Sequence, residues 1–105
     1  MNFGLKQEDI NKINEIFSHY TAIEQVILYG SRAKGNFQPG SDIDLAIIDL
    51  NLSFSDVSDI EMKLDDLLLP YKIDLAQKRK ISNLDLIEHI NRVGKVFYKE
   101  FDLGE

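Results

Sequence analysis

Apolar residues recur along the chain with two periods, and each period predicts a different kind of element. A spacing of three or four residues marks three segments as amphipathic helices: residues 5–20, 53–69 and 82–94. Runs of alternating or β-branched apolar residues mark four segments as strands: residues 25–29, 43–49, 71–77 and 96–101. This order predicts a layered α/β fold, in which helices cover a small, mostly mixed sheet of about four strands.

Capping residues suggest where the later helices begin and end. Either Ser53 or Ser55 is expected to accept a hydrogen bond at the start of the second helix. Ser82 with Asp85 resembles a capping box at the start of the third helix. Gly94 stands where a left-handed residue commonly ends a helix.

The connection between the first two strands carries the strongest chemical pattern. Gly30 and Ser31 form a turn that leads into a short helix expected over residues 31–34, and Asp42 and Asp44 open the second strand. Residues two apart in a strand point to the same side, so the two carboxylates project together, ~6–7 Å apart. Like charges held in this way raise the pKa of one of them unless a cation lies between them.

A phosphate site and a metal site are therefore expected to lie close together. The turn after the first strand offers free backbone N–H groups, which suit a phosphate. Asp74, on the third expected strand, adds another carboxylate. Two divalent metals ~3.5–4 Å apart, held by hard oxygen ligands, can clamp the attacking and leaving oxygens at phosphorus. This combination describes a nucleoside-triphosphate site with Mg²⁺, although a solvated strand start would also explain the Asp-x-Asp pair by itself.

The charged residues near these motifs are less informative. Arg32 follows the Gly-Ser turn and could reach a phosphate as a bidentate donor, but an arginine at a helix start is often simply solvated. The same solvated reading is favoured for Lys34 and for the basic run at residues 78–80, which could otherwise steer an anionic substrate. His19 and His89 stand alone on helical segments, and their spacing predicts no chemistry.

Length and composition exclude several classes of protein. The 105 residues suffice for one packed core, so we expect a single domain over residues 1–105. A net charge of −6 argues against a broad basic surface for DNA or RNA. The absence of cysteine excludes disulfides and thiolate metal sites. No apolar run approaches the length of a membrane span or a signal peptide core, so we expect a cytoplasmic protein without membrane contact.

The Gly-Ser pair at residues 30–31, followed after ten residues by Asp-x-Asp, resembles the signature of the polymerase-β-type nucleotidyltransferase superfamily. The sequence GSRAKG…SDIDLAI is similar to that of the stand-alone minimal nucleotidyltransferase (MNT) branch of this superfamily. The resemblance implies the polymerase-β palm fold. It also implies two Mg²⁺ ions, with Mn²⁺ as an alternative, bound by Asp42 and Asp44. Asp74 would complete the second metal site and orient or deprotonate the attacking hydroxyl.

The same resemblance implies a substrate and a reaction. ATP is expected as the nucleoside triphosphate, although no residue in the sequence identifies the base. The Gly-Ser turn would hold the β- and γ-phosphates, with Arg32 as an additional contact. Attack at the α-phosphorus would release pyrophosphate and leave AMP on a hydroxyl.

The acceptor is expected to come from another chain. Larger members of the superfamily resemble this core with an added helical domain that selects the acceptor, and these residues include no such domain. The MNT branch implies a helical HEPN-domain toxin as the partner, with AMP transferred from ATP to one of its tyrosines and this chain as the antitoxin. Two alternatives remain open: a catalytically vestigial module that neutralises a HEPN partner by contact, and a transferase acting on a small-molecule hydroxyl.

Overall fold

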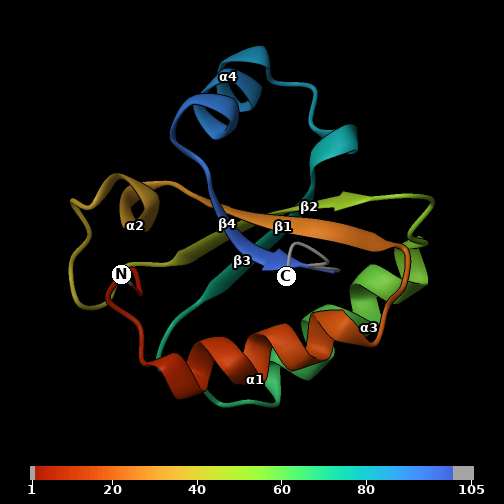
Figure 1. Cartoon of the computed structure of the whole chain (residues 1–105), viewed down its shortest axis with the longest axis horizontal. Helices are drawn as coiled ribbons and strands as arrows, with labels where there is room; N and C mark the ends of the chain where they lie inside the picture. Colours follow the sequence, from red (N-terminus) through yellow and green to blue (C-terminus); the bar gives the residue numbers. More distant parts are fainter. Residues whose placement is uncertain (1, 101–105) are drawn as a thin grey trace, which may run out of the picture.

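The computed structural model describes residues 2–100, which form one four-stranded sheet with helices on both faces (Figure 1). The strands are β1 (Ile23–Tyr29), β2 (Ile43–Asp49), β3 (Ile73–Gln77) and β4 (Lys95–Lys99). Their order across the sheet is β3-β2-β1-β4. Strand β1 is antiparallel to β2 and β4, whereas β2 and β3 are parallel. The predicted fold class, a small mixed sheet covered by helices, is confirmed.

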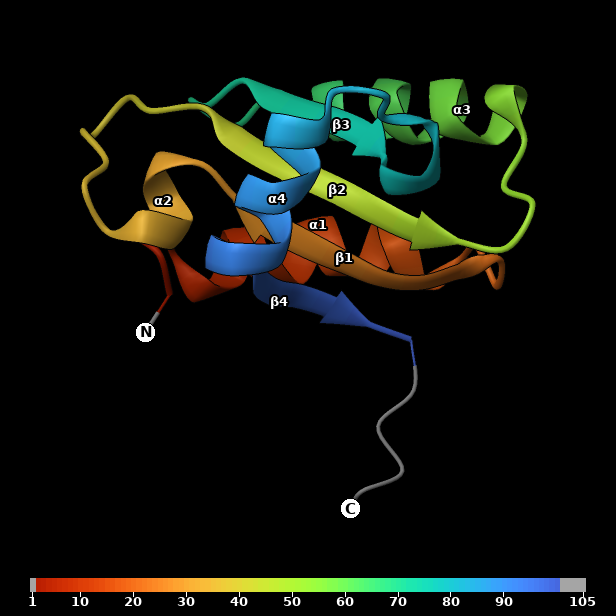
Figure 2. The same cartoon turned by 90° about the horizontal axis from the view of Figure 1, so that it is seen from above.

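The helices divide the sheet into a packed face and a more open face. Helices α1 (Gln7–Ser18) and α3 (Phe54–Asp65) lie side by side on one face, and α4 (Leu84–Val93) crosses the other (Figure 2). The short helix α2 (Ser31–Lys34) follows β1, and a 3₁₀ turn, η1 (Lys78–Lys80), follows β3.

The hydrophobic core lies between the sheet and the pair α1 and α3. The inward residues of β2 on this side, Ile43, Leu45 and Ile47, are fully buried. They pack in one cluster with Phe17 of α1 and Ile60 of α3. The side chains that alternate with them on β2 point toward α4, so Asp44 lies on the open face. No helix among residues 2–100 is long and apolar enough to cross a membrane.

Two helix starts show how side-chain caps set the boundaries. Ser53 caps α3, because its Oγ accepts a hydrogen bond of 3.0 Å from the backbone N–H three residues on. Asn83, rather than the expected Ser82, caps α4, and its Oδ1 accepts a bond of 3.2 Å in the same way. The expected cap, Ser82, was therefore wrong by one residue, because an asparagine side chain caps a helix as well as a serine does.

Gly94 differs from its expected role at the end of α4. Its backbone is extended, with φ −61° and ψ 147°, so it is not a left-handed cap. A Cβ at this position would lie 2.5 Å from Ile27 Cγ2 and 2.4 Å from the Ile90 carbonyl oxygen. Glycine is needed here because the chain passes closely over β1 as it enters β4. The expected end of the last strand, residue 101, lies outside the described residues.

Candidate active site

The turn after β1 can be built only with glycine. Gly30 has φ 77° and ψ −156°, a region that is essentially restricted to glycine. A Cβ on this residue would lie 2.4 Å from Asp44 Oδ2. Helix α2 begins at the next residue, Ser31. The expected Gly-Ser turn therefore lies directly against the first carboxylate of β2.

Strand pairing places two of the expected site residues side by side with an aromatic neighbour. Asp44 lies opposite Tyr29 of β1 and opposite Asp74 of β3. Directly paired residues point to the same face of a sheet, so these three side chains form a row on the α4 side. Asp42 precedes β2 by one residue and is exposed. The three aspartates expected from the sequence thus come from the beginnings of the parallel strands β2 and β3.

Electrostatic coupling follows from this proximity. Burial, followed by the charges of Asp74 and Asp42, raises the pKa of the Asp44 carboxyl above its ordinary value of 3.8. His89 and Lys72 lower the same pKa and offset part of the effect. Repulsion among carboxylates is the condition that a divalent cation relieves.

The aspartates fit a divalent metal by charge and by donor type, although they do not form a finished cage. Within residues 2–100, no three carboxylate or imidazole side chains converge as a metal site requires. The hard oxygen donors of the aspartates are those preferred by Mg²⁺ and Mn²⁺.

Arg32 has a structural position that the sequence did not reveal. Its side chain is 1% exposed. Nε and Nη2 donate to the Ser41 carbonyl at 3.2 and 2.9 Å, and Nη1 donates to the Phe3 carbonyl at 2.9 Å. The guanidinium also stacks between the rings of Phe37 and Tyr71, at 5.1 and 4.9 Å. Its donors face backbone carbonyls, so Arg32 anchors the chain just before the first aspartate, and the phosphate contact expected for it stays a prediction.

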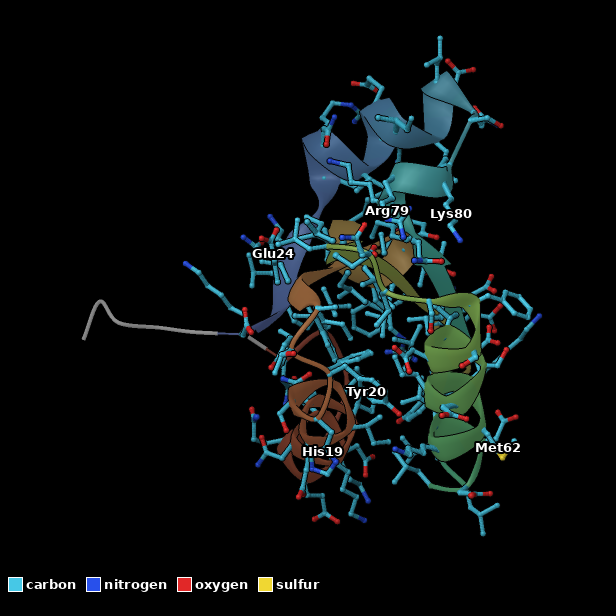
Figure 3. All side chains as sticks on the ribbon, turned by 90° about the vertical axis from the view of Figure 1, so that its right-hand side faces the viewer. His19, Tyr20, Glu24, Met62, Arg79 and Lys80 are labelled. Carbon is cyan, nitrogen blue, oxygen red and sulfur yellow. The ribbon has the colours of Figure 1, made fainter. Side chains whose placement is uncertain are left out.

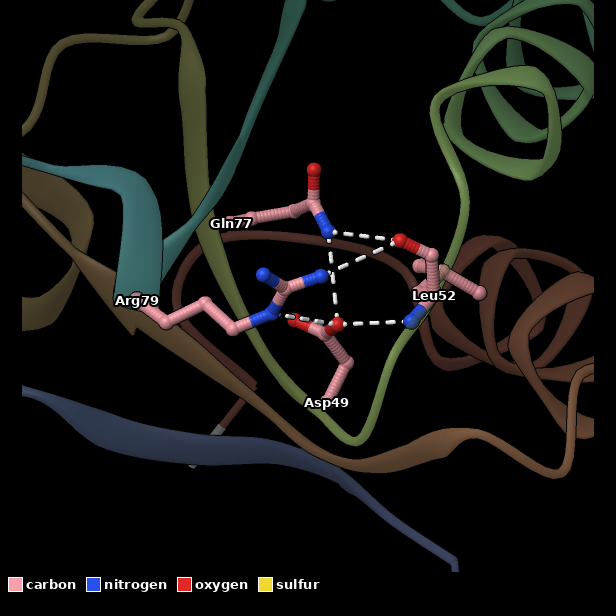
Figure 4. A network of polar contacts seen from close by, with 4 residues as sticks. All are labelled: Asp49, Leu52, Gln77 and Arg79. Atoms are coloured by element: carbon pink, nitrogen blue, oxygen red, sulfur yellow. Dashed lines mark hydrogen bonds and ion pairs between the residues drawn. The ribbon is translucent and has the colours of Figure 1, made fainter.

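The basic run after β3 also serves the fold in part. Asp49, at the end of β2, has a fully buried carboxylate whose Oδ2 accepts bonds from Arg79 Nε at 3.0 Å and Gln77 Nε2 at 3.3 Å (Figure 4). The backbone N–H of Leu52 donates to the same oxygen at 2.9 Å. This network joins the ends of β2 and β3. Arg79 and Lys80 lie at the same end of the molecule, and both are exposed (Figure 3).

His89 is a site residue that sequence reasoning missed. Its Nε2 accepts a hydrogen bond of 3.1 Å from the Gly30 backbone N–H. Its ring meets Tyr29 edge-on, with centroids 6.1 Å apart and an angle of 81°. The only available signal was position, since His89 falls on the partly buried helix face that carries Leu86 and Ile90. His19, in contrast, lies on the far side of the molecule from α4 (Figure 3).

A cleft of about 370 Å³ opens beside the edge strand β3. Leu64 of α3, Leu69 and Tyr71 of the preceding loop, and residues 72–75 line it. Asp74 thus lines this cleft and also forms, with Asp44, the pair of adjacent carboxylates that we call the carboxylate row.

Comparison with known protein families identifies the class of this protein. A family model described as "Polymerase beta, Nucleotidyltransferase" matches residues 11–102. The chain therefore belongs to the polymerase-β nucleotidyltransferase family. Among curated proteins, none matches the chain.

Solved structures share this fold. A toxin–antitoxin structure with AMP-PNP contains a chain that is 23% identical with a TM-score of 0.69, covering 90% of this chain and 74% of that chain. The structure of the tri-AMPylated Shewanella oneidensis HEPN toxin in complex with MNT antitoxin contains a chain that is 22% identical, with a TM-score of 0.66. The match covers 90% of this chain and 73% of that chain. A chain of a MntA-HepT toxin–antitoxin structure is 22% identical, with a TM-score of 0.65 and the same coverages.

Proposed function

We propose that the protein is a Mg²⁺-dependent nucleotidyltransferase that transfers AMP from ATP to a tyrosine hydroxyl of a HEPN-domain partner, as the antitoxin of a toxin–antitoxin pair. One observation carries the proposal. The glycine turn after β1 lies against Asp44, and Asp44 is paired with Asp74 on the same face of the sheet. The turn proposed to bind phosphate and the carboxylates proposed to bind metal are thereby adjacent, which supports transfer at a metal-bound triphosphate.

Each residue of the proposed site has a distinct task. Asp42 and Asp44 would hold both metal ions, and Asp74 would complete the second site. When bound, the metals supply positive charge that stabilises the oxygens around phosphorus. The backbone of Gly30 and Ser31 would hold the β- and γ-phosphates.

The transfer step itself needs a base near the acceptor. The acceptor oxygen attacks the α-phosphorus, its proton passes to the Asp74 carboxylate, and the bond to the pyrophosphate oxygen breaks. Asp74 is exposed and lines the cleft beside β3, which supports an approach of the acceptor from that edge. Proton transfer to a positioned carboxylate of this kind contributes ~10²–10⁴-fold to a rate.

Two observations support a protein acceptor. The structural neighbours include an AMPylated HEPN toxin in complex with an MNT antitoxin. The chain also carries a net charge of −6, which would favour association with a basic, RNA-cleaving partner. A contact-only antitoxin with a vestigial site is the second candidate, because an acidic chain would also associate with a basic partner without any transfer reaction.

Label transfer separates these candidates. The wild-type protein, the double variant Asp42→Asn/Asp44→Asn and the control Asp59→Asn, an exposed position on α3, would be incubated with Mg²⁺, a lysate of the source cells and ATP labelled at the α- or γ-phosphate. Nucleotidyl transfer predicts one protein band with α-label only, absent from the double variant and retained by the control. A band with γ-label, or label confined to small molecules, would contradict transfer of AMP to a protein. Absence of all label, with a small protein still co-purifying with both forms, would favour the contact-only antitoxin.

A further inference from the structure

The backbone N–H of the glycine turn has a hydrogen-bond partner on α4. The Gly30 N–H, which the proposed function assigns to a phosphate, donates to His89 Nε2 at 3.1 Å. The two residues are separated by 59 positions in the sequence, and the bond joins α4 to the end of β1. An imidazole nitrogen of α4 therefore occupies the place beside the turn that a phosphate oxygen would take.

His89 also lies close to the carboxylates of the proposed metal site. Its ring packs edge-on against Tyr29, the residue directly opposite Asp44 in the sheet. The charge of His89 is also among those that act on the Asp44 carboxyl. The ring thus lies beside the glycine turn and against the residue paired with Asp44, so it adjoins both parts of the proposed site.

One N–H cannot donate fully to two acceptors. The Nε2 lone pair of His89 and a phosphate oxygen would compete for the same Gly30 hydrogen. Binding of a phosphate at the turn must therefore release the imidazole from Gly30. The released Nε2 is left next to an anion, where it can donate once it carries a hydrogen, either as the other neutral tautomer or as the cation.

We propose that His89 is a phosphate-contacting residue of the nucleotide site, which exchanges its bond with the Gly30 N–H for a bond to a phosphate oxygen when a nucleoside triphosphate binds. This inference rests on the proposed function. It fills a gap in the site, because the Arg32 guanidinium faces the backbone carbonyls of Phe3 and Ser41 instead of the turn. His89 supplies the side-chain donor that the buried arginine does not.

Binding measurements with and without the β- and γ-phosphates test the exchange. Isothermal titration with Mg²⁺ would compare a non-hydrolysable ATP analogue and AMP on wild type, His89→Ala, His89→Gln and the distant control His19→Ala. Loss of a hydrogen bond to a charged phosphate predicts that His89→Ala weakens binding of the triphosphate by about tenfold or more. Binding of AMP should stay close to the wild-type value. His89→Gln should recover most of the affinity, because an amide can both accept from Gly30 and donate to a phosphate.

Other outcomes would overturn the inference in recognisable ways. Triphosphate binding by His89→Ala that equals or exceeds the wild-type value would mean that the histidine only competes for the turn. An equal loss for the triphosphate and AMP, with a lowered melting temperature, would mean a purely structural role. A wild-type protein that binds no triphosphate would overturn the proposed function as well, whereas normal binding by both wild type and His89→Ala would overturn this inference alone.

Discussion

Replacing Gly30 by alanine should damage the site and the fold through two separate effects. The residue has φ 77° and ψ −156°, a conformation that costs a non-glycine residue about 1–3 kcal/mol. For a domain of this size, that strain should lower the melting temperature by about 4–15 °C. The new Cβ would also lie 2.4 Å from Asp44 Oδ2, so the carboxylate has to rotate away from the turn. Nucleotidyl transfer should then fall well beyond the loss explained by stability.

Alanine variants of two other glycines serve as controls that separate the backbone strain from the steric contact with Asp44. Gly35 has φ 89°, but a Cβ there meets nothing within 4 Å, so Gly35→Ala should be strained without moving the aspartate. Gly40 also has open space around it, and Gly40→Ala should change little. Thermal unfolding and label transfer from α-labelled ATP would be measured for all three variants at a temperature where each is folded. Equal activity of Gly30→Ala and Gly35→Ala would refute the steric argument, and equal melting temperatures of Gly30→Ala and Gly40→Ala would refute the strain.

Three further predictions concern stability. Asp49→Ala removes the carboxylate that accepts from Arg79 and two other donors. Urea unfolding should therefore show that the free energy of unfolding falls by about 2–4 kcal/mol. A smaller decrease than that caused by Arg79→Ala would argue against the network. Arg32→Lys cannot reproduce the guanidinium bonds to backbone carbonyls and should cost about 1–3 kcal/mol, while triphosphate affinity of the folded protein stays unchanged; a selective loss of that affinity would restore a phosphate role. Burial and neighbouring carboxylates raise the pKa of Asp44, so the native state binds more protons than the unfolded state and stability falls as pH rises through that pKa. Asp44→Asn should therefore raise the melting temperature at pH 7 and have little effect near pH 3, and the reverse pattern would contradict the coupling.

Local patterns in the sequence were sufficient for the elements and for the carboxylate row. Strand alternation and helical spacing depend on neighbouring residues, and they located all four strands and the long helices. The turn at Gly30 and the aspartates at positions 42 and 44 stand within one short connection. Asp74 was also found, because its strand alternates clearly, and parallel pairing of β2 with β3 brings it beside Asp44.

Contacts between distant segments could not be predicted in the same way. The burial of Arg32 depends on carbonyls from Phe3 and Ser41 converging on one point, and no local pattern records that convergence. His89 reaches Gly30 only because α4 crosses the open face of the sheet. The role of Gly94 likewise follows from a close approach to β1 rather than from a turn.

The closely spaced carboxylates of the candidate site lower the stability of the folded protein. Asp44 is partly buried between Tyr29 and Asp74, and its charge is disfavoured by that position. Such an arrangement costs folding free energy unless a cation neutralises it. Binding of Mg²⁺ with a nucleotide should accordingly stabilise the protein, since a ligand that binds only the native state raises its stability.

The chemical identity of the modified acceptor tests the central claim most directly. The α-labelled protein obtained with wild type, ATP and Mg²⁺ would be isolated, and its peptides would be analysed by tandem mass spectrometry. We expect the mass of one AMP on a tyrosine of a helical HEPN-domain protein, absent when Asp42→Asn/Asp44→Asn replaces the wild type. A modification that persists with the double variant, or a phosphoryl group without adenosine, would contradict nucleotidyl transfer by these aspartates.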